Sequence, residues 1–500
     1  MLKRIVSGIV GVIAIAASAF AADVTLKSRL DPVIDRAIKD ERIVGTVVLV
    51  ARDGKLIYKK AAGLADREAR RPVTLDTQFR LASLTKPIVA AATVALADAE
   101  IFRLDDPVTR WYPEFKPKLA DGREPDVTVY QLLSHTAGLG YGYLESGKGP
   151  YHQAGVSDGF DRSVPSLDEN LKRLAKAPLL YEPGTGWSYS IGYELLGGVL
   201  ENAGKGRLPA VLQRTVTKPL GLKATTFTPA DKKRVAAQYA FAIPRPKRLA
   251  DSDTIDVGKS PLPVAPGRVF DRKAYPSAGA GLVGTAEDYL KFLEAIRQGG
   301  TPILDSAAVY SFTTNSLGLI TSPALGKGWG YGYGVAVLKN QGLAESLHGV
   351  GTWRLSGEYG SHFWVDPQAG LTVVVLTNTA GAGTQERFSD DITRAVYGPE
   401  RKIAQPTVDG IPVTTVVEGK AYKFVPEAVN AASFSIANKP SWAAFDAASG
   451  ALTGTPKTED VGTYGDIVIT ATNSSGSASL PGFALTVAPV PPPAAPVAAK

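Results

Sequence analysis

Ser83 and Lys86 are the residues of this chain whose types and spacing most directly suggest covalent chemistry. They lie three residues apart, just before the apolar, alanine-rich run Ile88 to Ala99, which we expect to be helical. This spacing puts both side chains on one face of a helix, where a lysine with a depressed pKa can take the proton of a serine hydroxyl. The start of a helix also offers free backbone N–H groups that stabilise developing negative charge. Two such common residues meet at this spacing about once or twice by chance in a chain of this length, so the pair alone does not define a site.

Three further segments turn this pair into a family pattern. In chain order, and in the spacing in which they follow the Ser83–Lys86 pair, they resemble the beta-lactamase-related serine hydrolases, a family that includes class C beta-lactamases, DD-carboxypeptidases, D-aminopeptidases and family VIII carboxylesterases. The resemblance covers the chain from about residue 30 to about residue 395. The segments are Leu132 to Leu139, Glu182 to Ser190 with Tyr193 to Gly197, and Gly357 to Ser361 with Phe363 to Pro367.

The resemblance implies a role for each matching residue. Ser83 is expected to be the nucleophile that forms an acyl-enzyme, Lys86 its partner, and Tyr189 a group that carries protons to and from Ser83. A phenol near an ammonium is favoured as phenolate, so tyrosine and lysine can share the role of base. The oxyanion hole is expected to consist of the backbone N–H groups of Ser83 and Glu358, a role for which the identity of the side chain matters little.

Two departures from the family pattern bear on the substrate, which we expect Ile191, Leu355, Ser356 and Gly357 to contact. The second motif often has asparagine where this chain has Ile191, and the loss of the amide removes a hydrogen bond to substrate amides. The third motif reads Leu355-Ser356-Gly357, so it lacks a lysine that would bind a substrate carboxylate. Arg354 is adjacent, but neighbours on a strand point to opposite faces. Both departures favour less charged esters over beta-lactams and D-Ala-D-Ala peptides.

The leading hypothesis is therefore a carboxylesterase-type serine hydrolase that needs no cofactor and acts on a small-molecule ester or related acyl compound. One alternative on the same fold is a beta-lactamase, a D-Ala-D-Ala carboxypeptidase or a D-aminopeptidase, with an amide or beta-lactam substrate. A second alternative is a non-catalytic protein that binds cell-wall fragments. None of the four histidines, His135, His152, His348 and His362, has zinc-ligand spacing, so we expect no metal site.

Two other motifs invite catalytic interpretations that we reject. His135 follows Ser134, but adjacent residues rarely face each other, so we interpret His135 as structural. Gly155 to Gly159 matches G-x-S-x-G, which in α/β-hydrolases needs a buried strand before it and a helix after it. The preceding stretch, Gly149 to Gln153, is polar, so we expect a surface loop there, bordering the substrate entrance.

The N-terminus predicts export. A positive start, Met1 to Arg4, precedes a short apolar run from Ile5 to Ala17 and an Ala-x-Ala site that ends at Ala21. This describes a signal peptide over residues 1–21, with the mature chain beginning near Ala22 in the periplasm or outside the cell. No later segment is apolar enough to span a membrane, and there are no cysteines. The net charge of +7 is scattered rather than clustered, so nucleic acid is not expected as a partner.

The hydrophobic patterns predict an α+β domain followed by a small all-β domain. Strands are expected at Val44 to Val50 and Leu56 to Tyr58, joined by an Asp-Gly turn, and again at Gly334 to Leu338, Phe363 to Val365 and Leu371 to Thr377. Strands at both ends around a helical middle predict a shared antiparallel sheet with a helical region, as in beta-lactamases and penicillin-binding proteins.

The sequence also predicts the domain limits. The hydrolase domain is expected over 24–398, a β-sandwich over 404–487 and a Pro/Ala-rich tail over 488–500. The sandwich resembles the Ig-like modules of bacterial exported proteins, and a spacer role or a cell-wall or surface polymer as partner is the associated hypothesis. Trp442 is interpreted as a core residue of this sandwich.

Overall fold

The chain folds into two compact units in the computed structural model, which describes residues 25–162, 166–382 and 386–490. The first unit runs to Pro399 without the short segments Lys327–Trp329 and Leu338–Val350, which belong to the second unit with the residues from Glu400 onward. The predicted signal peptide, residues 1–21, and most of the predicted tail lie outside the described residues. In the described part, no helix is long and apolar enough to cross a membrane.

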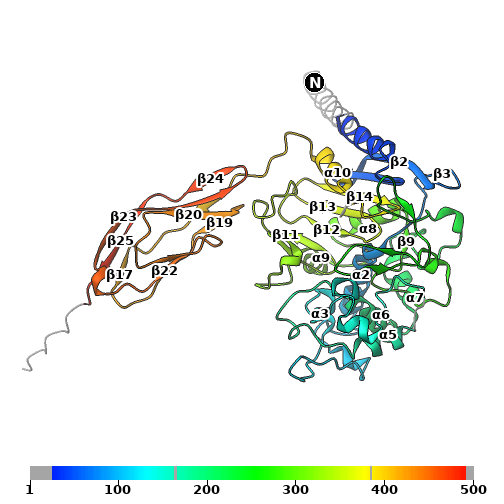
Figure 1. Cartoon of the computed structure of the whole chain (residues 1–500), viewed down its shortest axis with the longest axis horizontal. Coiled ribbons are helices and arrows are strands. Elements are labelled where there is room, and N and C mark those ends of the chain that lie inside the picture. The colour runs from blue at the N-terminus through cyan, green and yellow to red at the C-terminus, as the bar shows by residue number, and fades with distance from the viewer. Residues whose placement is uncertain (1–24, 163–165, 383–385, 491–500) are drawn as a thin grey trace, which may run out of the picture. The chain divides into compact units, whose positions relative to one another are not determined.

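An antiparallel sheet of eight strands forms the framework of the first unit (Figure 1). Its central pair joins the two ends of the unit, because β1 lies antiparallel to β14 with Thr46 opposite Thr377 and Arg52 opposite Leu371. The prediction of a sheet shared by both ends of this region is thus confirmed. In spatial order the strands are β10 (Trp329–Tyr331), β11 (Ala336–Leu338), β12 (Trp353–Ser356), β13 (His362–Asp366), β14 (Leu371–Thr377), β1 (Gly45–Arg52), β2 (Lys55–Asp66) and β3 (Arg71–Pro72).

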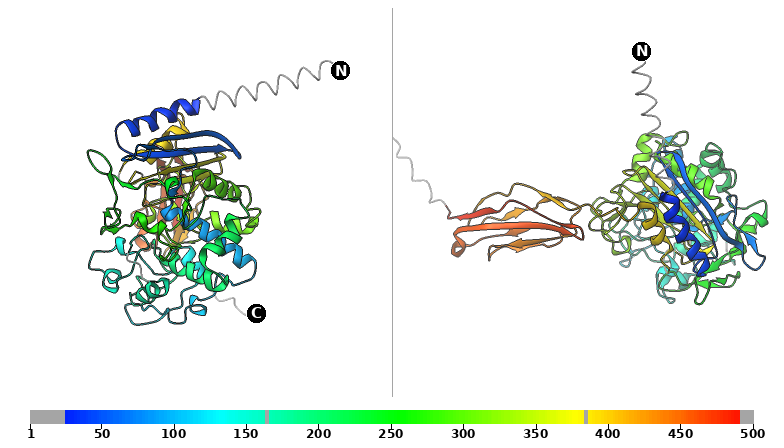
Figure 2. Two further views of the ribbon diagram at one scale, coloured as in Figure 1. Left: turned by 90° about the vertical axis from the view of Figure 1, so that its right-hand side faces the viewer. Right: turned by 90° about the horizontal axis from the view of Figure 1, so that it is seen from above.

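Both faces of the sheet are buried, which explains why β1 reads as a continuous apolar run rather than an alternating one. Val47 and Leu49 pack into the large core beside the helical region, whereas Val48 and Val50 pack into a smaller core on the other face. That smaller core is covered by a helix over residues 25–39 and by α10 (Phe388–Tyr397). Figure 2 shows the first of these helices, in dark blue, lying along the strands β1 and β2.

Helix α2 (Thr85–Asp98) runs through the large core and is buried along nearly its whole length. Its alanine-rich sequence lets neighbouring helices approach closely, and Pro87 is tolerated because it lies in the first turn. It contacts α6, α7 and α9. The other helices of the unit are α3 (Val129–Leu133), α4 (Pro150–Ala154), α5 (Leu167–Leu174), α6 (Gly192–Ala203), α7 (Leu208–Leu212), α8 (Ala286–Arg297) and α9 (Ser306–Thr313).

Short strands extend this framework at its edges. They form small pairs or triplets rather than a further large sheet. They are β4 (Phe79–Arg80) with β9 (Val283–Gly284), β7 (Thr254–Ile255) with β8 (Leu262–Pro263), and β15 (Thr379–Ala380) with β5 (Tyr239–Ala240) and β6 (Lys247–Arg248).

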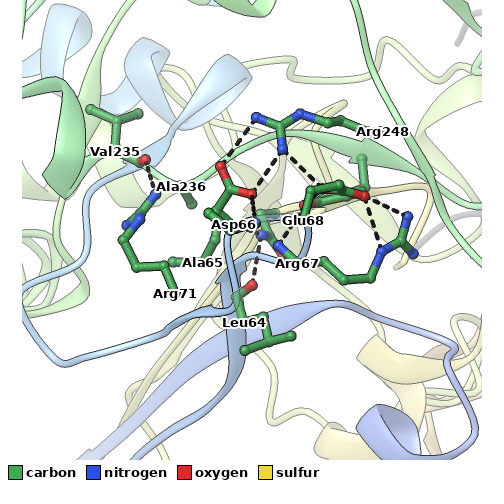
Figure 3. Close-up of polar contacts among 12 residues, drawn as sticks. Leu64, Ala65, Asp66, Arg67, Glu68, Arg71, Val235, Ala236 and Arg248 are labelled. Atoms are coloured by element: carbon green, nitrogen blue, oxygen red, sulfur yellow. Dashed lines mark hydrogen bonds and ion pairs between the residues drawn. The ribbon is translucent and has the colours of Figure 1, made fainter.

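The end of β2 carries a network of charged groups and one tyrosine, which we call the β2-end network. It consists of Asp66, Arg67, Glu68 and Arg248, which Figure 3 labels, and of Tyr239. The Arg248 guanidinium contacts Asp66 Oδ1 at 2.8 Å and Glu68 Oε2 at 2.9 Å. The Tyr239 hydroxyl donates to Glu68 at 2.6 Å and accepts from the Arg67 backbone N–H at 2.8 Å. These bonds tie β2 to the small sheet formed by β15, β5 and β6.

The second unit consists mainly of β-strands that pack around a core of their own. The core includes Leu452, Ile467, Ile469 and Leu485. One sheet has the order β17, β25, β23, β20 with β24 beside β23; a second has the order β18, β22, β21; and β16 pairs with β19. Trp442 packs against the core residues, as its interpretation as a core residue requires.

The strands of this unit are short apart from β23, which Figure 2 (right) shows running the length of the module. They are β16 (Thr407–Asp409), β17 (Thr415–Val417), β18 (Tyr422–Phe424), β19 (Glu427–Val429), β20 (Ser433–Ala437), β21 (Ala444–Phe445), β22 (Leu452–Gly454), β23 (Gly462–Asn473), β24 (Gly476–Ser479) and β25 (Phe483–Ala488).

Candidate active site

Ser83 lies in a single turn of 3-10 helix (Ala82–Leu84) that leads directly into α2. The preceding residue, Ala82, has a φ of 47°, in the left-handed region that non-glycine residues rarely adopt. Such strain is characteristic of functional sites, where the surrounding structure holds a residue in place. Lys86 follows in the first turn of α2, and its Nζ donates a hydrogen bond to Ser83 Oγ at 2.9 Å. The spacing noted in the sequence thus brings both side chains into direct contact.

Three side chains from distant parts of the chain meet at Ser83 Oγ. Besides Lys86, the Tyr189 hydroxyl donates to this oxygen at 2.7 Å, and Ser83 donates to Glu358 Oε2 at 2.8 Å. A serine hydroxyl has one hydrogen and two lone pairs. Because the ammonium and the phenol occupy both acceptor positions, the hydrogen of Ser83 points to the Glu358 carboxylate.

Lys86 is completely buried, and this burial lowers the pKa of its ammonium to about 8, against the opposing influence of the Glu358 and Glu194 carboxylates. Its Nζ also donates to the carbonyl oxygen of Gly279 at 2.9 Å and lies 4.7 Å from the centre of the Tyr189 ring. With this pKa about a tenth of the lysine is neutral at pH 7, and that fraction can accept a proton.

Glu194 supports this arrangement from behind the lysine. Its carboxylate accepts hydrogen bonds from Ser277 Oγ at 2.5 Å and from the Gly279 N–H at 3.1 Å, so it fixes the residue whose carbonyl binds Lys86. Burial raises the pKa of Glu194, with these hydrogen bonds acting in the opposite direction. We therefore regard Glu194 as a positioning residue for Lys86.

Tyr189 is a neutral hydrogen-bond donor in this structure. Burial of its hydroxyl raises its pKa well above the ordinary value, and the Glu358 carboxylate adds to the rise. Burial and the carboxylate both favour the phenol over the phenolate, so the proton-carrying role expected of Tyr189 starts from its neutral form. His135 packs against the Tyr189 ring, with ring centres 4.7 Å apart.

Glu358 follows β12 in the tight turn that approaches the Ser83 turn. Gly357 must be glycine there, since a Cβ atom would lie 2.8 Å from the Leu81 carbonyl oxygen and 3.2 Å from Ala82 Cβ. The N–H groups of Ser83 and Glu358 have no hydrogen-bond acceptor among residues 25–162, 166–382 and 386–490. Two free donors beside the nucleophile fit the predicted oxyanion hole.

The side chain of Glu358 was expected to be unimportant, but the structure gives it two contacts. It accepts from Ser83, and its Oε1 accepts from the Tyr143 hydroxyl at 3.0 Å. Tyr143 is held in turn by Asp158, whose carboxylate accepts from the N–H groups of Gly142 and Tyr143 at 2.9 and 3.0 Å. Burial raises the pKa of Asp158 to about 6, while these two hydrogen bonds act in the opposite direction.

The four residues expected to contact substrate occupy different environments. Ile191 is fully buried and Leu355 nearly so, both in the large core, while Gly357 is buried and Ser356 exposed. Arg354 pairs with Trp364, which packs into the smaller core, whereas Leu355 pairs with Phe363 of the large core. The guanidinium of Arg354 therefore lies on the face away from Leu355 and cannot replace the missing lysine.

The two rejected motifs have structural roles. His135 is buried, its Nδ1 accepts from the Ser190 N–H at 3.2 Å, and burial lowers its pKa well below the ordinary value, so it is neutral. Ser157 of the G-x-S-x-G match has neither the strand nor the helix of a nucleophile elbow. It is buried rather than at the surface, which corrects our expectation of a surface loop. The reason is that its backbone is held against α5, where its N–H donates to Asn170 Oδ1 at 2.8 Å and its carbonyl oxygen accepts from Asn170 Nδ2 at 2.9 Å.

Sequence reasoning missed four contributors: Tyr143, Glu194, Gly279 and the Glu358 carboxylate. Glu194 and Glu358 lie within the quoted family segments, but the sequence does not show which groups their side chains contact. Glu194 reaches the site from α6, and Tyr143 and Gly279 reach it from segments far from Ser83 in the chain. No group of three or more His, Cys, Asp or Glu side chains suited to a metal ion occurs in the described part of the chain.

A serine bonded to a buried lysine and a tyrosine, set where a helical region meets an antiparallel sheet, defines a serine hydrolase. Residues 30–396 match the family model described as Beta-lactamase, and residues 405–488 match the model described as "Putative Ig domain". The chain belongs to the beta-lactamase-related family and is an enzyme of the serine hydrolase class.

Similar proteins lie in more than one branch of the family. Esterase EstB of Burkholderia gladioli is 44% identical over 76% of this chain and 97% of its own length. The structure of EstCE1, a hydrolase with promiscuous acyltransferase activity, superposes with a TM-score of 0.73 and 41% identity, covering 76% of this chain and all of that one. N-acetylmuramyl-L-alanine amidase of Bacillus subtilis is 27% identical over 70% of this chain and 80% of its own length.

Proposed function

We propose that this protein is an exported carboxylesterase-type hydrolase that acts through an acyl-enzyme on Ser83. The observation that carries the proposal is the pair of hydrogen bonds that Ser83 Oγ receives from Lys86 and Tyr189. The similarity to EstB and EstCE1 supports an ester as the substrate. Leu355 and Ile191 stand where the family pattern often has a lysine and an asparagine, and neither side chain can bind a substrate carboxylate or amide, which also favours an ester.

In the proposed mechanism, Lys86 in its neutral form accepts the Ser83 hydrogen in place of Glu358 and takes this proton as Oγ attacks the ester carbonyl carbon. The carbonyl oxygen takes up the electron pair and is stabilised by the N–H groups of Ser83 and Glu358. Tyr189, a neutral phenol, passes a proton to the departing alcohol oxygen and regains one from Lys86. Water then attacks the acyl carbon and gives a proton to these groups, the bond between the acyl carbon and Ser83 Oγ breaks, and a proton is delivered to Oγ as the acid leaves.

The test is hydrolysis of a para-nitrophenyl ester by the wild type and by Ser83→Ala, with intact-protein mass spectrometry after brief mixing. We expect an acyl adduct on the wild type only, and a fall in kcat of about four orders of magnitude or more in the variant. Hydrolysis by Ser83→Ala at the wild-type rate would refute the proposal. A penicilloyl adduct, or loss of penicillin in the same assay, would favour the beta-lactam branch instead.

Export and the second unit form a separate part of the proposal. The predicted signal peptide implies a mature N-terminus near Ala22, which N-terminal sequencing of the secreted protein tests. The family matches at 30–396 and 405–488 support domain limits near 24–398 and 404–487. For the Ig-like module we propose a spacer or wall-binding role, tested by retention of Ser83→Ala on peptidoglycan with and without residues 404–487.

A further inference from the structure

The side chain of Glu358 is a charge held in direct contact with the proposed nucleophile. Two hydroxyl groups fix the carboxylate, Ser83 Oγ on Oε2 at 2.8 Å and Tyr143 on Oε1 at 3.0 Å. Any acyl group that bonds to Ser83 therefore comes within a few ångströms of this carboxylate.

The charges around Ser83 differ in their exposure. Lys86 is completely buried and faces the Glu194 carboxylate as well as Glu358, whereas Glu358 is only partly buried. The charge nearer to solvent at the nucleophile is thus negative.

Aromatic rings lie beside this carboxylate. Tyr143 contacts it through the hydroxyl group, and the Tyr141 ring lies 5.0 Å from that of Tyr143 and 5.5 Å from that of Tyr189. Both the Tyr141 and Tyr143 rings are nearly fully buried, and the Lys86 ammonium already lies 5.5 Å from the Tyr141 ring. The group that would attract a substrate cation is therefore the partly exposed Glu358 carboxylate and not a ring face. The same carboxylate repels a substrate carboxylate.

We infer that Glu358 selects substrates by charge: it favours acyl compounds with a cationic group near the scissile carbonyl over neutral ones, and neutral ones over carboxylates. The inference rests on the proposed function in one respect, that Ser83 is the nucleophile. It goes beyond it by assigning a substrate class and a residue that determines it.

The experiment measures how fast Ser83 is labelled by three fluorophosphonates that differ only at the end of a short alkyl chain. The ends are a trimethylammonium group, an uncharged tert-butyl group of the same shape, and a carboxylate. In each case Ser83 Oγ bonds to phosphorus and fluoride leaves, which mass spectrometry follows without any need for ester turnover. The rates are compared between the wild type and Glu358→Gln, which keeps the shape and removes the charge.

We expect the wild type to react fastest with the cationic probe and slowest with the anionic one. Unit charges about 6 Å apart at an effective dielectric constant of about 20 change a rate by roughly a hundredfold, and salt screening reduces this to about tenfold. In Glu358→Gln the cation-to-neutral ratio should fall by about that factor. Tyr143→Phe should reduce the ratio less, because it frees the carboxylate without removing it.

Ratios serve as the readout because a general loss of reactivity cancels from them. Glu169→Gln is the matched control, since Glu169 is exposed on α5 and paired with Arg173, and its ratios should equal those of the wild type. Equal cation-to-neutral ratios in the wild type and Glu358→Gln would overturn the inference while leaving the proposed function intact. Charge-dependent labelling without any ester hydrolysis would refute the proposed function and keep the inference, and no labelling of Ser83 by any probe would refute both.

Discussion

The Ser83 site and the β2-end network are both clusters of charged and hydroxyl groups, but they differ in whether each charge has a direct ion pair. In the β2-end network the guanidinium of Arg248 is shared by two carboxylates and is 44% exposed (Figure 3). At Ser83 the fully buried Lys86 ammonium donates to a serine hydroxyl and a backbone carbonyl, and no carboxylate in the described part of the chain lies within ion-pair distance of it.

The pKa shifts follow from this difference. Burial alone would raise the pKa of Glu68, but hydrogen bonds from Tyr239 and Arg248 outweigh it and bring the value to about 2. At Ser83, burial dominates instead, so the pKa of Lys86 falls and those of Tyr189 and Glu194 rise. Groups in direct ion pairs keep their ordinary charges, whereas the buried Lys86, which has hydrogen bonds but no direct ion pair among the described residues, can exchange a proton. A cluster of charged groups therefore does not by itself identify the active site. A buried charge that has no direct ion pair does so here.

Lys86→Met is expected to have the largest effect, because it removes the buried ammonium that distinguishes the Ser83 site from the β2-end network. We expect kcat for ester hydrolysis to fall about a thousandfold, because the variant lacks the group that exchanges protons with Ser83. The melting temperature should be equal or higher, since a buried ammonium without a direct ion pair opposes folding. Kinetics and calorimetry on the same sample check this, and a large drop in stability would contradict it.

The pH dependence of activity and of stability tests whether Lys86 has the lowered pKa that distinguishes the Ser83 site. If the Lys86 amine with its pKa of about 8 is the base, kcat/KM should rise about tenfold per pH unit below pH 8 and level off above it. The ammonium has a lower pKa in the folded chain than its ordinary 10.5, so the unfolded chain binds more protons between these values. The free energy of unfolding should therefore increase from pH 8 to 10.5 through this group, and this increment should be missing in Lys86→Met.

Arg248→Met tests the other cluster. Removing the shared guanidinium should lower the free energy of unfolding by about 1 kcal/mol, because partly exposed ion pairs are weak. For a unit of this size this corresponds to about 2 °C in melting temperature. Ester hydrolysis should keep its kcat, and a tenfold loss would show that the β2-end network acts on the site.

Glu68→Gln has the smallest expected effect. The Glu68 carboxylate has a lower pKa in the folded chain than its ordinary 4.5, so its contribution is present above that pH and lost as the pH falls towards about 2. The wild type should lose slightly more stability than the variant on acidification through this window. The difference should stay below about 1 kcal/mol, because the side chain is 44% exposed. Acid titrations followed by circular dichroism, with Glu169→Gln as control, measure it.

Local patterns predicted much of the framework. Leu371 to Thr377 was expected as a strand and is β14 with the same limits, because a run of β-branched residues buried on both faces has no competing helical pattern. The run Ile88 to Ala99 was expected to be helical, and α2 begins three residues earlier, at Thr85, because Lys86 and Pro87 suit a first turn. The segment Gly334 to Leu338 was expected as a strand, but Gly334, with a φ of 76°, precedes the pairing, which starts at Ala336.

By itself the sequence determined the family, the α+β architecture and the contact between Ser83 and Lys86, because these depend on residues near one another in the chain or on motifs in a fixed order. Only the tertiary structure decided which partners complete the site. Tyr143 lies 215 residues from Glu358, and Gly279 lies 193 residues from Lys86, so no local pattern links them. It also decided the protonation of Tyr189, since burial and the approach of the Glu358 carboxylate both raise the pKa of Tyr189, and both are properties of the folded chain.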